Sequence, residues 1–530
     1  MKEVKRKRRV DRKPELEVPV ELIQRIQSLL PLKEAAQTCI LSKSWLHAWS
    51  TVPTLRFHPS DKYHGRRQQA RYIKLIRRTL RRYHRDNIPI ESFSLYLSIQ
   101  DMKSASVAEK WIRRVSSKSC LKKLYLEISV RKGSFMLPDE IFSGENLDTA
   151  SITADWSLSN ILSISSNCVI NCVSLRVLKL IEVHVSEEVL NNLLSTCSLL
   201  EKVKLSLPEG SRTIKVKNLR YLRKLKIHSK DPNDVLEIHD VPSLRLLSYD
   251  SSLAFAWVPR KSLLLNADVL GGVKELSLAG VIMDDSLSDI IKSKFPFLEG
   301  LAIDILDCRL EILDITCNSL KRLKIEACED GMMDVRVYAP SLLFFSYTGL
   351  AMPTFLFPAV APEQIELNLT LQNPVDNSFF LKMRETLDLS RNSIIKLVRD
   401  GSVFQVPFNI DIDGLKQSVP FPATNVQELR FSSYPGRIPT WDDSLFCKAM
   451  FLICHPIYVK ANQIKVNNYF WKRFVNGMIK KKARRKNWPH LKDVEIKSNL
   501  NREWETLTSS CIEAHIDWCN IELKLTWCSP

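Results

Sequence analysis

One short pattern of apolar residues returns along most of the chain from Leu121 onward: two apolar positions three residues apart, then a third after one further residue. Copies between Leu175 and Leu342 begin 22 to 29 residues apart. Since side chains alternate between the two faces of a strand, the second and third apolar residues of each copy point the same way. The pattern therefore predicts a series of short strands, each with one buried face. The copies are Leu121/Leu124/Leu126, a weaker Leu147/Ala150/Ile152, Leu175/Leu178/Leu180, Leu200/Val203/Leu205, Leu222/Leu225/Ile227, Leu244/Leu247/Tyr249, Val273/Leu276/Leu278, Leu298/Leu301/Ile303, Leu320/Leu323/Ile325, Leu342/Phe345/Tyr347, Val426/Leu429/Phe431 and Leu491/Val494/Ile496.

A period of about 20–29 residues built on this pattern is the signature of a leucine-rich repeat, in which each copy contributes one strand. Stacked repeats bury a common core and form a curved solenoid with a parallel sheet on its inner face. We therefore expect an α/β fold, a horseshoe-shaped leucine-rich-repeat αβ solenoid with a parallel sheet, over residues 96–440. Unrelated alternating strands would not explain the regular step. The pattern is weakest from Pro362 to Pro422, where Ile394 and Leu397 indicate a degraded repeat.

Residues 15–60 have a helical periodicity instead and are expected to form a separate module. Pro19 stands where a first-turn proline is tolerated, Pro31 interrupts the first apolar stripe, and Ser42 is a suitable N-cap for a third helix. So small a unit cannot hide all of its large apolar side chains, so we expect a partner protein to cover some of them. The alternative is a helical cap on the repeat array. The three apolar stripes, one for each predicted helix, are Leu22/Ile23/Ile26/Leu29/Leu30, Leu32/Ala35/Ala36/Cys39/Ile40 and Trp45/Leu46/Trp49.

Positive charge is concentrated in three places, although the whole chain carries a net charge of +18. Met1–Lys13 holds eight Lys/Arg and two acids, Lys62–Arg85 holds ten Lys/Arg and no acid, and Lys480–Lys486 holds six Lys/Arg. Residues 1–14 have no apolar periodicity and are expected to be a basic disordered tail. Such a run serves as a nuclear import signal, as a nucleic-acid patch or simply as a solvated tail.

The second basic run has the pattern of an amphipathic helix. Tyr72, Ile76, Leu80 and Tyr83 recur at helical spacing within residues 66–85, and arginines fill much of the remaining surface. This predicts a helix packed on an apolar surface, and residues 61–95 would hold this linker helix and a first strand. Its basic face is either solvated or a contact for an acidic partner.

Composition narrows the class of protein. Hydrophobic residues make up 45% of the chain, and the 14 glycines in 530 residues are too few for glycine-rich linkers or several phosphate-binding loops. No apolar run reaches the roughly 18 residues of a membrane helix, and none follows the basic N-terminus, so neither a membrane span nor a secretory signal is expected. The 13 scattered cysteines are then expected to be reduced thiols of an intracellular protein, nuclear and/or cytoplasmic.

Motifs for catalysis or metal binding are missing from the sequence. It contains no H-E-x-x-H, G-x-S-x-G or Walker motif. Cys168 and Cys172 lack a second pair at zinc spacing and are interpreted as helix or core thiols. Phe408–Gly414 lacks the ligand series of a calcium loop and is predicted to be a surface loop. We expect no enzyme activity, no cofactor and no metal.

The N-terminal module resembles an F-box. Val18–Trp49 reads VPVELIQRIQSLLPLKEAAQTCILSKSWLHAW, and the family pattern is an L-P dipeptide, a helix with I/L spacing, L-P-x-K-D/E-A, then L-S-K-R-W and a second Trp. Val18 and Ser44 replace the usual Leu and Arg. Val52–Phe57 continues like the family's trailing P-x-L-x-F.

The repeats resemble those of plant F-box/leucine-rich-repeat proteins. Ser195–Leu200, Ser293–Leu298 and Ala339–Leu342 are similar to the C-P-x-L-E-x-L and A-P-x-L units of that family. His490–Lys497 is similar to a strand of its C-terminal FBD domain, although the acidic helix usual after that strand is replaced. Residues 441–530 are therefore expected to hold C-terminal repeats or a divergent FBD-like region.

The resemblance implies a non-catalytic adaptor. F-box modules bind a Skp-type adaptor protein, and through it a cullin–RING ubiquitin ligase, while the repeats hold a protein substrate whose identity the sequence does not reveal. The residues that the resemblance places at the Skp-type interface or its immediate support are Pro19, Leu22, Ile26, Leu29, Pro31, Leu41, Trp45 and Trp49. The alternative is a nuclear leucine-rich-repeat scaffold whose basic patches contact nucleic acid, although these patches lack the interleaved aromatic residues of such sites.

The strand pattern also indicates a surface for the substrate. Residues beside the second and third apolar positions face away from the core. In the middle repeats these places hold small or acidic residues, among them Ser248, Asp250, Glu275 and Asp304. The sequence thus predicts a basic strip that is either solvated or a dock for an acidic or phosphorylated segment. Its lysines, in the early repeats, are Lys179, Lys202, Lys204, Lys224 and Lys226.

Overall fold

The structure is a computed structural model, and the chain forms two compact units, Met1–Leu200 and Glu201–Pro530. The residues it describes are 18–30, 32–59, 66–155, 160–210, 212–231, 233–251, 264–308, 312–327, 334–371, 375–399, 408–433, 444–462, 474–475, 478–479, 488, 490–497, 503–508 and 521–528. The basic runs Met1–Lys13 and Lys480–Lys486, and also Pro31, lie outside them.

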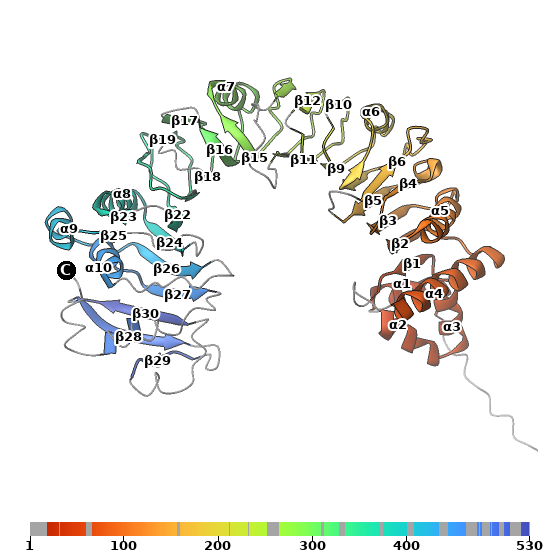
Figure 1. The fold of residues 1–530 in the computed structure, drawn as a ribbon, viewed down its shortest axis with the longest axis horizontal. Helices are drawn as coiled ribbons and strands as arrows, with labels where there is room; N and C mark the ends of the chain where they lie inside the picture. The colour runs from red at the N-terminus through yellow and green to blue at the C-terminus, as the bar shows by residue number, and fades with distance from the viewer. Residues whose placement is uncertain are drawn as a thin grey trace, which may run out of the picture. The chain divides into compact units, whose positions relative to one another are not determined.

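The first unit begins with a module of short helices (Figure 1): α1 Val20–Leu29, α2 Leu32–Gln37, the 3-10 turn η1 Thr38–Ile40 and α3 Lys43–Ser50. Pro19 is the N-cap of α1 and so lies just outside its first turn. Ser42 caps α3, because its Oγ accepts a hydrogen bond from the backbone N–H of Trp45 at 3.3 Å. Ile23, Ala35 and Ala48 are buried where the helices meet. The chain thus has helices at the three predicted stripes.

The long helix α4, Arg66–Arg85, packs its apolar stripe against the rest of the first unit. Ile76, Leu80 and Tyr83 are buried. The Tyr83 hydroxyl donates to the backbone oxygen of Val52 at 2.8 Å, and Arg82 Nη2 donates to the backbone oxygen of Ser50 at 3.0 Å. These bonds join α4 to the chain that leaves α3, so the helical module is anchored to α4.

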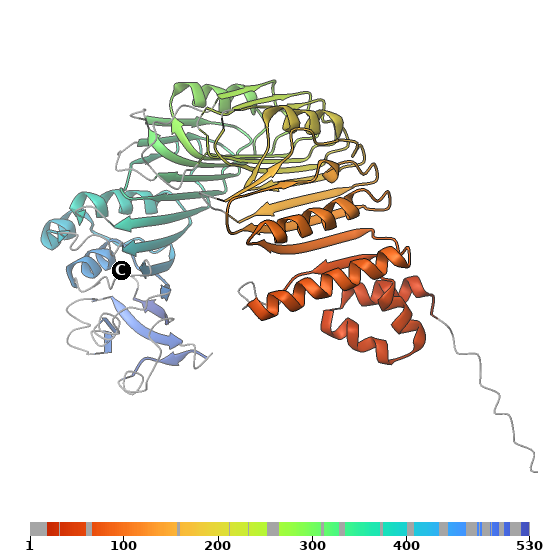
Figure 2. The same ribbon diagram turned by 45° about the vertical axis from the view of Figure 1, so that its right-hand side comes forward.

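The main sheet of the first unit is parallel, in the order β1 Thr54–Phe57, β2 Ser92–Ile99, β3 Lys123–Val130, β5 Thr149–Ala154 and β7 Val177–Ile181. A smaller parallel sheet runs beside it, made of β4 Ser134–Leu137, β6 Ile161–Ile164 and β8 Val183–His184. Helices α5 Met102–Ser116 and α6 Glu187–Thr196 and the turn η2 Asp139–Ile141 complete the unit, as Figure 2 shows from the side.

The second unit continues the same construction. Its main parallel sheet runs through β9 Lys202–Leu207, β11 Lys224–Ser229, β13 Leu246–Asp250, β15 Glu275–Met283, β16 Gly300–Cys308, β18 Arg322–Ala327, β20 Phe344–Gly349, β22 Gln364–Leu371, β24 Asn392–Arg399, β26 Val426–Ser433 and β27 Tyr458–Asn462. Three smaller sheets accompany it. The first consists of β10 Thr213–Lys217, β12 Val235–His239 and β14 Leu264–Ala267, and the second of β17 Ile312–Thr316, β19 Asp334–Tyr338 and β21 Phe355–Leu356. The third consists of β23 Val375–Asp376 and β25 Phe408–Asn409. The helices are α7 Asp285–Lys294, α8 Asn377–Asp388, α9 Ile412–Ser418 and α10 Ser444–Ile453.

The repeated apolar positions form the core of both units. In the copy Leu222/Leu225/Ile227 all three side chains are at most 2% exposed, and every other copy of the pattern is buried as well. The alternate residues of each main strand lie on the other face, which we call the open face. The predicted α/β fold with a large parallel sheet is therefore confirmed.

Two local predictions were wrong. The degraded repeat uses Ile395 and Leu397 as its buried pair, whereas Ile394 lies on the open face, because side chains alternate regularly along β24. Phe408–Gly414 is more than a loop: β25 is followed by α9, whose N-cap Asp411 accepts hydrogen bonds from the backbone N–H groups of Asp413 and Gly414, both at 3.1 Å. The stretch of weak pattern also contains β22, with Ile365 and Leu367 buried.

The C-terminal end of the second unit is not a further repeat. Leu491, Val494 and Ile496 lie on β28 Leu491–Lys497, which pairs antiparallel with β30 Glu522–Trp527. Strand β30 in turn pairs antiparallel with β27, and the short β29 Glu505–Thr506 pairs antiparallel with β28. A repeat strand would add parallel to β27, so the apolar spacing of Leu491/Val494/Ile496 marks a strand but not a repeat.

Candidate functional site

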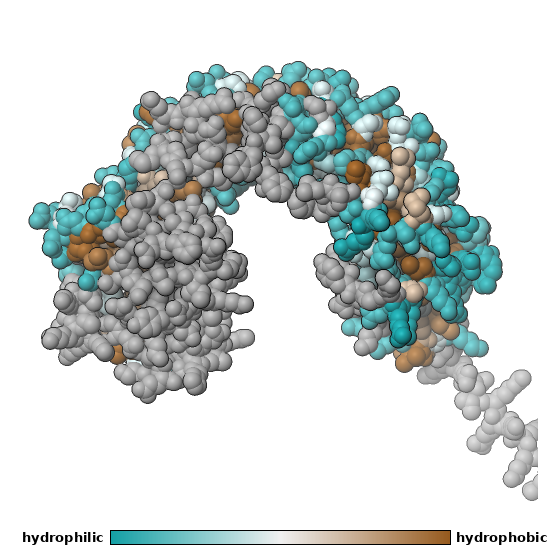
Figure 3. Space-filling view, viewed as in Figure 1, coloured by the Kyte–Doolittle hydropathy of each residue, from teal (hydrophilic) through white to brown (hydrophobic). Residues whose placement is uncertain are grey.

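The helical module carries an apolar surface that its own packing leaves open. Leu22, Ile26 and Leu29 of α1 follow one another at spacings of four and three residues, on one face of the helix. They are 51%, 43% and 80% exposed, while Ile23 on the other face is buried. Figure 3 shows hydrophobic surface on this module. We define the apolar surface as Leu22, Ile26, Leu29, Ile40, Leu41 and Leu46, which are all exposed.

Polar contacts inside the module hold this surface in place. Gln27 is buried, and its Nε2 donates to Thr38 Oγ1 at 2.9 Å and to the backbone oxygen of Trp45 at 3.1 Å. Gln24 Nε2 donates to the Thr51 hydroxyl oxygen at 3.0 Å and to its backbone oxygen at 3.1 Å. These bonds tie α1 to η1 and α3 through residues outside the apolar surface.

The structure places the residues of the implied adaptor interface in three groups. Pro19 and Leu41 are exposed along with Leu22, Ile26 and Leu29 of α1, whereas Trp45 and Trp49 are half-buried and support the module. Pro31 lies outside the described residues.

Sequence reasoning missed two residues of the apolar surface, Ile40 and Leu46. Ile40 belongs to the second predicted stripe, but the helix ends at Gln37 and a 3-10 turn follows, so this stripe does not continue as one face of a single helix. The N-cap Ser42, which already marks the start of the next helix, is the signal that could have revealed this break.

Helix α4 presents a second surface, which is strongly basic. Arg67, Arg71, Lys74, Arg78 and Arg81 are exposed at alternating spacings of four and three residues. None of the five forms an ion pair within the described part of the chain, whereas Arg85 pairs with Asp86 at 2.7 Å. The basic face of α4 is thus a row of uncompensated positive charges.

A third surface lies on the open face of β9 and β11. Lys202 is opposite Lys224 in the parallel register, and Lys204 is opposite Lys226. All four side chains are exposed, and the residues between them, such as Val203 and Leu225, are buried. Adjacent strands are about 4.8 Å apart and alternate residues about 6.6 Å apart. We call these four residues the lysine cluster; no carboxylate of the described residues pairs with them.

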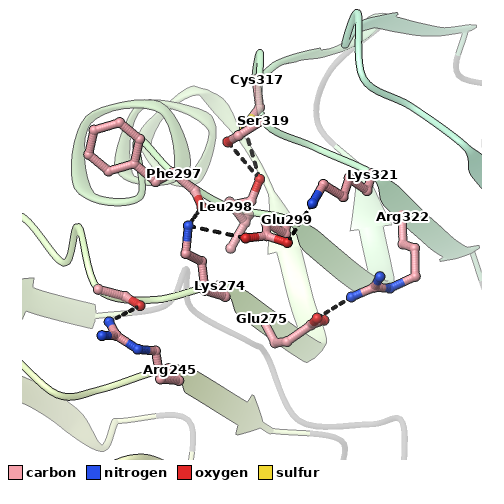
Figure 4. Close-up of polar contacts among 11 residues, drawn as sticks. Arg245, Lys274, Glu275, Phe297, Leu298, Glu299, Cys317, Ser319, Lys321 and Arg322 are labelled. Carbon is pink, nitrogen blue, oxygen red and sulfur yellow. Dashed lines mark hydrogen bonds and ion pairs between the residues drawn. The ribbon is translucent and has the colours of Figure 1, made fainter.

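Charges farther along the same open face are largely neutralised in pairs. Figure 4 shows that Glu275 forms an ion pair with Arg322 over the intervening strand. The carboxylate of Glu299, just before β16, forms ion pairs with the ammonium groups of Lys274 at 3.1 Å and Lys321 at 3.0 Å. The two ammonium groups lower the pKa of Glu299. Further pairs are His228–Asp250, Glu366–Lys396, Glu428–Arg430, Glu428–Lys460 and Glu495–Lys524. The lysine cluster differs from these pairs because no carboxylate among the described residues pairs with it.

Lys179, the fifth lysine of the predicted strip, lies on β7 in the first unit. It is half-buried and stands opposite Ser151 of β5. Asp304 and Glu326 face each other in the register of β16 and β18, and burial followed by repulsion from Asp304 raises the pKa of Glu326. The predicted change from basic to mildly acidic residues along the face is thus present in the second unit, with most of the acids held in ion pairs.

The described residues show no metal or nucleophile site. No group of three or more His, Cys, Asp and Glu side chains among them could hold a metal ion, and none of their helices is long and apolar enough to cross a membrane. Cys172 lies in the core with its Sγ 3.4 Å from that of Cys197. Burial raises the pKa of the half-buried Cys168 to about 11, so this thiol stays protonated near neutral pH.

Comparison with known proteins found relatives of one kind. The family profile described as "FBD-associated F-box protein At5g56370, LRR repeats" matches residues 108–255. The F-box/LRR-repeat protein At3g26922 of Arabidopsis thaliana is 30% identical over 190 residues, which are 35% of this chain and 57% of the relative. The putative F-box/FBD/LRR-repeat protein At4g13965 of the same plant is 26% identical over 258 residues, 48% of this chain and 57% of the relative. The putative FBD-associated F-box protein At5g50270, also from Arabidopsis thaliana, is 25% identical over 336 residues, 60% of this chain and 76% of the relative.

The chain spans little more than half the length of the first two of these relatives. The profile match falls on strands of the main sheets from β3 to β13, where the repeated apolar pattern is regular.

Proposed function

We propose that the chain, which is similar to plant F-box/leucine-rich-repeat proteins, is the substrate-recognition adaptor of a Skp–cullin–F-box ubiquitin ligase. In this role helices α1 to α3 are the F-box and bind a Skp-type adaptor protein, which connects the chain to a cullin–RING ligase. The leucine-rich repeats hold a protein substrate. The chain has no catalytic part in ubiquitin transfer: it brings the substrate close to the subunits that carry the chemistry.

The observation that carries this proposal is the apolar surface. Exposed apolar side chains on a small module whose helices are joined by internal polar contacts are typical of a protein interface, because burying them removes apolar area from water. An amphipathic helix that presents residues at spacings of three and four is a common form of such a contact. The exposure of Leu22, Ile26 and Leu29 means that they are free for a partner and are not needed for the core of the module.

A pull-down with a Skp-type adaptor tests the proposal. The triple variant Leu22→Ala, Ile26→Ala and Leu29→Ala should weaken adaptor binding at least a hundredfold, since each truncation at an interface core costs about 1–2 kcal/mol or more. Its circular dichroism and thermal midpoint should match those of the unchanged chain. Leu75→Ala is the matched control, because Leu75 is likewise an exposed apolar residue, 57% exposed, but lies on α4 and not on α1 to α3. Full binding by the folded triple variant would exclude the F-box assignment.

For the substrate, we infer that the lysine cluster is the main contact. Four exposed ammonium groups without counter-charge attract an acidic or phosphorylated segment, and association relieves their mutual repulsion. The charged residues along β15 to β27 attract a binding partner less strongly, because each of them would first have to break its existing ion pair. Lys179 of the first unit, which is half-buried, stays a separate prediction for a substrate contact.

The basic face of α4 favours a second candidate function, that of a nuclear scaffold that contacts nucleic acid. Arginine binds phosphate through two parallel hydrogen bonds, and four of the five residues are arginines. In that case binding of the chain to duplex or single-stranded DNA would fall steeply with salt, and reversing Arg71 and Arg78 to Glu would reduce the salt slope. Adaptor capture that survives this reversal, without any measurable DNA binding by the unchanged chain, would leave only the first function.

The location proposed for the chain is nuclear and/or cytoplasmic. Met1–Lys13, with eight Lys/Arg, is the segment that would direct import. This segment would act on location alone, because it carries dense Lys/Arg and no periodic apolar residue that could pack against the fold.

A further inference from the structure

A cavity of about 430 Å³ opens on the first three strands of the first unit. Its walls come from the open face of β1, β2 and β3, which lie side by side in Figure 1. The side chains that concern us here are Thr54, Arg56, Ser92, Ser94, Lys123 and Tyr125. The cavity is separate from the apolar surface, the basic face of α4 and the lysine cluster, none of whose residues line it.

The register of the strands places hydroxyl groups at the centre and cations on both sides. Ser92 of β2 stands between Thr54 and Lys123, and Ser94 stands between Arg56 and Tyr125. Because neighbouring strands are about 4.8 Å apart, Arg56 and Lys123 start from strands about 10 Å apart. Both side chains are long enough to reach over β2 and to meet a ligand that lies on Ser92 and Ser94.

The cavity has an excess of positive charge that the protein itself does not neutralise. Arg56 and Lys123 are exposed and form no ion pair with the described residues. The acid of the lining is Glu91, and it is already paired with Lys122 at 3.0 Å. Two cations are therefore left for a ligand, which matches the charge of one dianionic group.

The floor of the cavity adds a polar group of fixed position. Ser94 is buried, and its Oγ lies 2.6 Å from Nε2 of His58. When His58 carries its proton on Nε2 it donates to Ser94 Oγ, and the Ser94 hydroxyl is then free to donate into the cavity. Thr54, Ser92 and Tyr125 supply three further hydroxyls at its walls.

We propose that this cavity binds a compact phosphate monoester. A phosphate carries nearly two negative charges and three acceptor oxygens, which suits two cations and several hydroxyl donors better than one carboxylate would. Every lining side chain carries a polar group, and none is a purely apolar residue, so the body of the ligand is small and hydrophilic. The volume is at the lower end of small-molecule sites. The proposal is independent of the adaptor function and stands or falls without it.

Calorimetric titration of the full chain tests this site, with inorganic phosphate and free phosphoserine as probes and sodium chloride adjusted to constant ionic strength. We expect saturable binding with one site for each probe and a rise of the thermal midpoint of the chain. Arg56→Gln and Lys123→Gln should each weaken binding about tenfold, because each removes a charge-assisted contact. Lys110→Gln, at an exposed position of α5 outside the cavity, should leave the affinity unchanged.

The proposal would be overturned if the chain showed no saturable binding at millimolar phosphate. It would also be overturned if the Arg56→Gln, Lys123→Gln and Lys110→Gln variants bound phosphate with equal affinity. Loss of phosphate binding in the double variant Lys204→Gln, Lys226→Gln would assign the anion to the lysine cluster and overturn it as well. A phosphoserine peptide that binds far more tightly than free phosphoserine would assign the cavity to a protein segment and would contradict the small-ligand assignment. Circular dichroism of both cavity variants verifies that they are folded.

Discussion

Glu275 and Arg322 form an ion pair across the whole width of a strand, because Gly300 of β16 stands between them in the parallel register (Figure 4). Their strands, β15 and β18, are two strand spacings apart, about 10 Å. The Glu275 carboxylate lies over Gly300, where a Cβ atom would collide with it. The absence of a side chain at Gly300 is therefore what allows a charge on one strand to reach a charge two strands away.

Alanine at Gly300 should cost little stability, whereas alanine at Gly272 should cost more. At Gly300 the colliding group is the mobile end of Glu275, which can move aside and lose only an exposed ion pair worth about 0.2–1 kcal/mol. At Gly272 the added Cβ would stand 2.8 Å from the backbone oxygen of Pro242 and 2.9 Å from that of Leu244, which cannot move freely. We expect Gly272→Ala to lower the free energy of unfolding by about 1–3 kcal/mol in urea titrations.

A double-mutant cycle isolates the collision at Gly300. In a Glu275→Ala background Gly300→Ala should be nearly neutral, since both the colliding group and the ion pair are already gone. Equal costs of Gly300→Ala in the two backgrounds would show that the glycine is required by its own backbone and not by Glu275.

The core of this fold was predictable because its pattern is local and repeated. Leu222, Leu225 and Ile227 could be assigned to one buried face from their spacing alone, and the same alternation placed Lys224 and Lys226 on the open face. The lysine cluster followed from that alternation too, since two neighbouring repeats with the same step bring equivalent residues together. Spacing within a strand and between repeats thus fixes both the core and one candidate surface.

Features that depend on non-local pairing were not predictable. The shift at Ser393 and Ile394 comes from the match between β24 and β26, and the antiparallel insertion of β30 beside β27 joins segments far apart in the chain. The cavity between Arg56 and Lys123 needs the register of three strands separated by long connections, one of which contains α4. The neutralisation of Glu275 by Arg322 likewise requires knowing that β16 separates their strands.

Buried His455 should make the second unit less stable in mild acid. Its ring stacks on that of Trp527 with centroids 3.9 Å apart, and burial, together with the nearby His490, lowers its pKa to about 4. A histidine in the unfolded chain has a pKa of about 6.5, so below that pH His455 is protonated in the unfolded chain but stays neutral in the folded chain. Stability should therefore fall as the pH drops from about 6.5 to 4, by roughly 3 kcal/mol at the end of that range. Urea unfolding at a series of pH values measures this loss.

His455→Phe separates this contribution from other titrating groups. Phenylalanine keeps a flat ring against Trp527, and His455 Nδ1 has no hydrogen-bond partner to lose. The variant should follow the unchanged chain above about pH 7 and lose less stability below it. Parallel pH profiles of the two proteins would mean that His455 binds its proton equally well in the folded and the unfolded chain.

Removal of Met1–Lys13 should change the location of the chain but not its stability. The segment has dense Lys/Arg and no periodic apolar residues, so it has the character of an import signal and none of a packed element. A fluorescent fusion of the shortened chain should shift toward the cytoplasm, while the thermal midpoint stays the same within error. If the fluorescence of the shortened fusion stays in the nucleus, Lys480–Lys486 becomes the candidate import signal. A variant with both runs deleted then shows whether Lys480–Lys486 or no import signal at all explains the result.

Charge reversal in the lysine cluster should abolish substrate capture without touching the adaptor interface. Lys202→Glu, Lys204→Glu, Lys224→Glu and Lys226→Glu change exposed side chains on β9 and β11, so the buried neighbours Val203 and Leu225 keep the strands in place. Each lost contact is worth about 0.2–1 kcal/mol, and four together, now turned into repulsion, should reduce recovery of substrates at least tenfold in cells with a blocked proteasome.

Capture by the unchanged chain should also weaken as salt is raised, because exposed charges are screened beyond about 8 Å at physiological ionic strength. A variant with the same change in net charge, Lys103→Glu, Lys110→Glu, Lys132→Glu and Lys292→Glu at other exposed positions, separates the cluster from overall charge. If both variants recover the same substrates as the unchanged chain while still binding the adaptor, the substrate contact lies elsewhere on the repeats and the assignment of the lysine cluster is wrong.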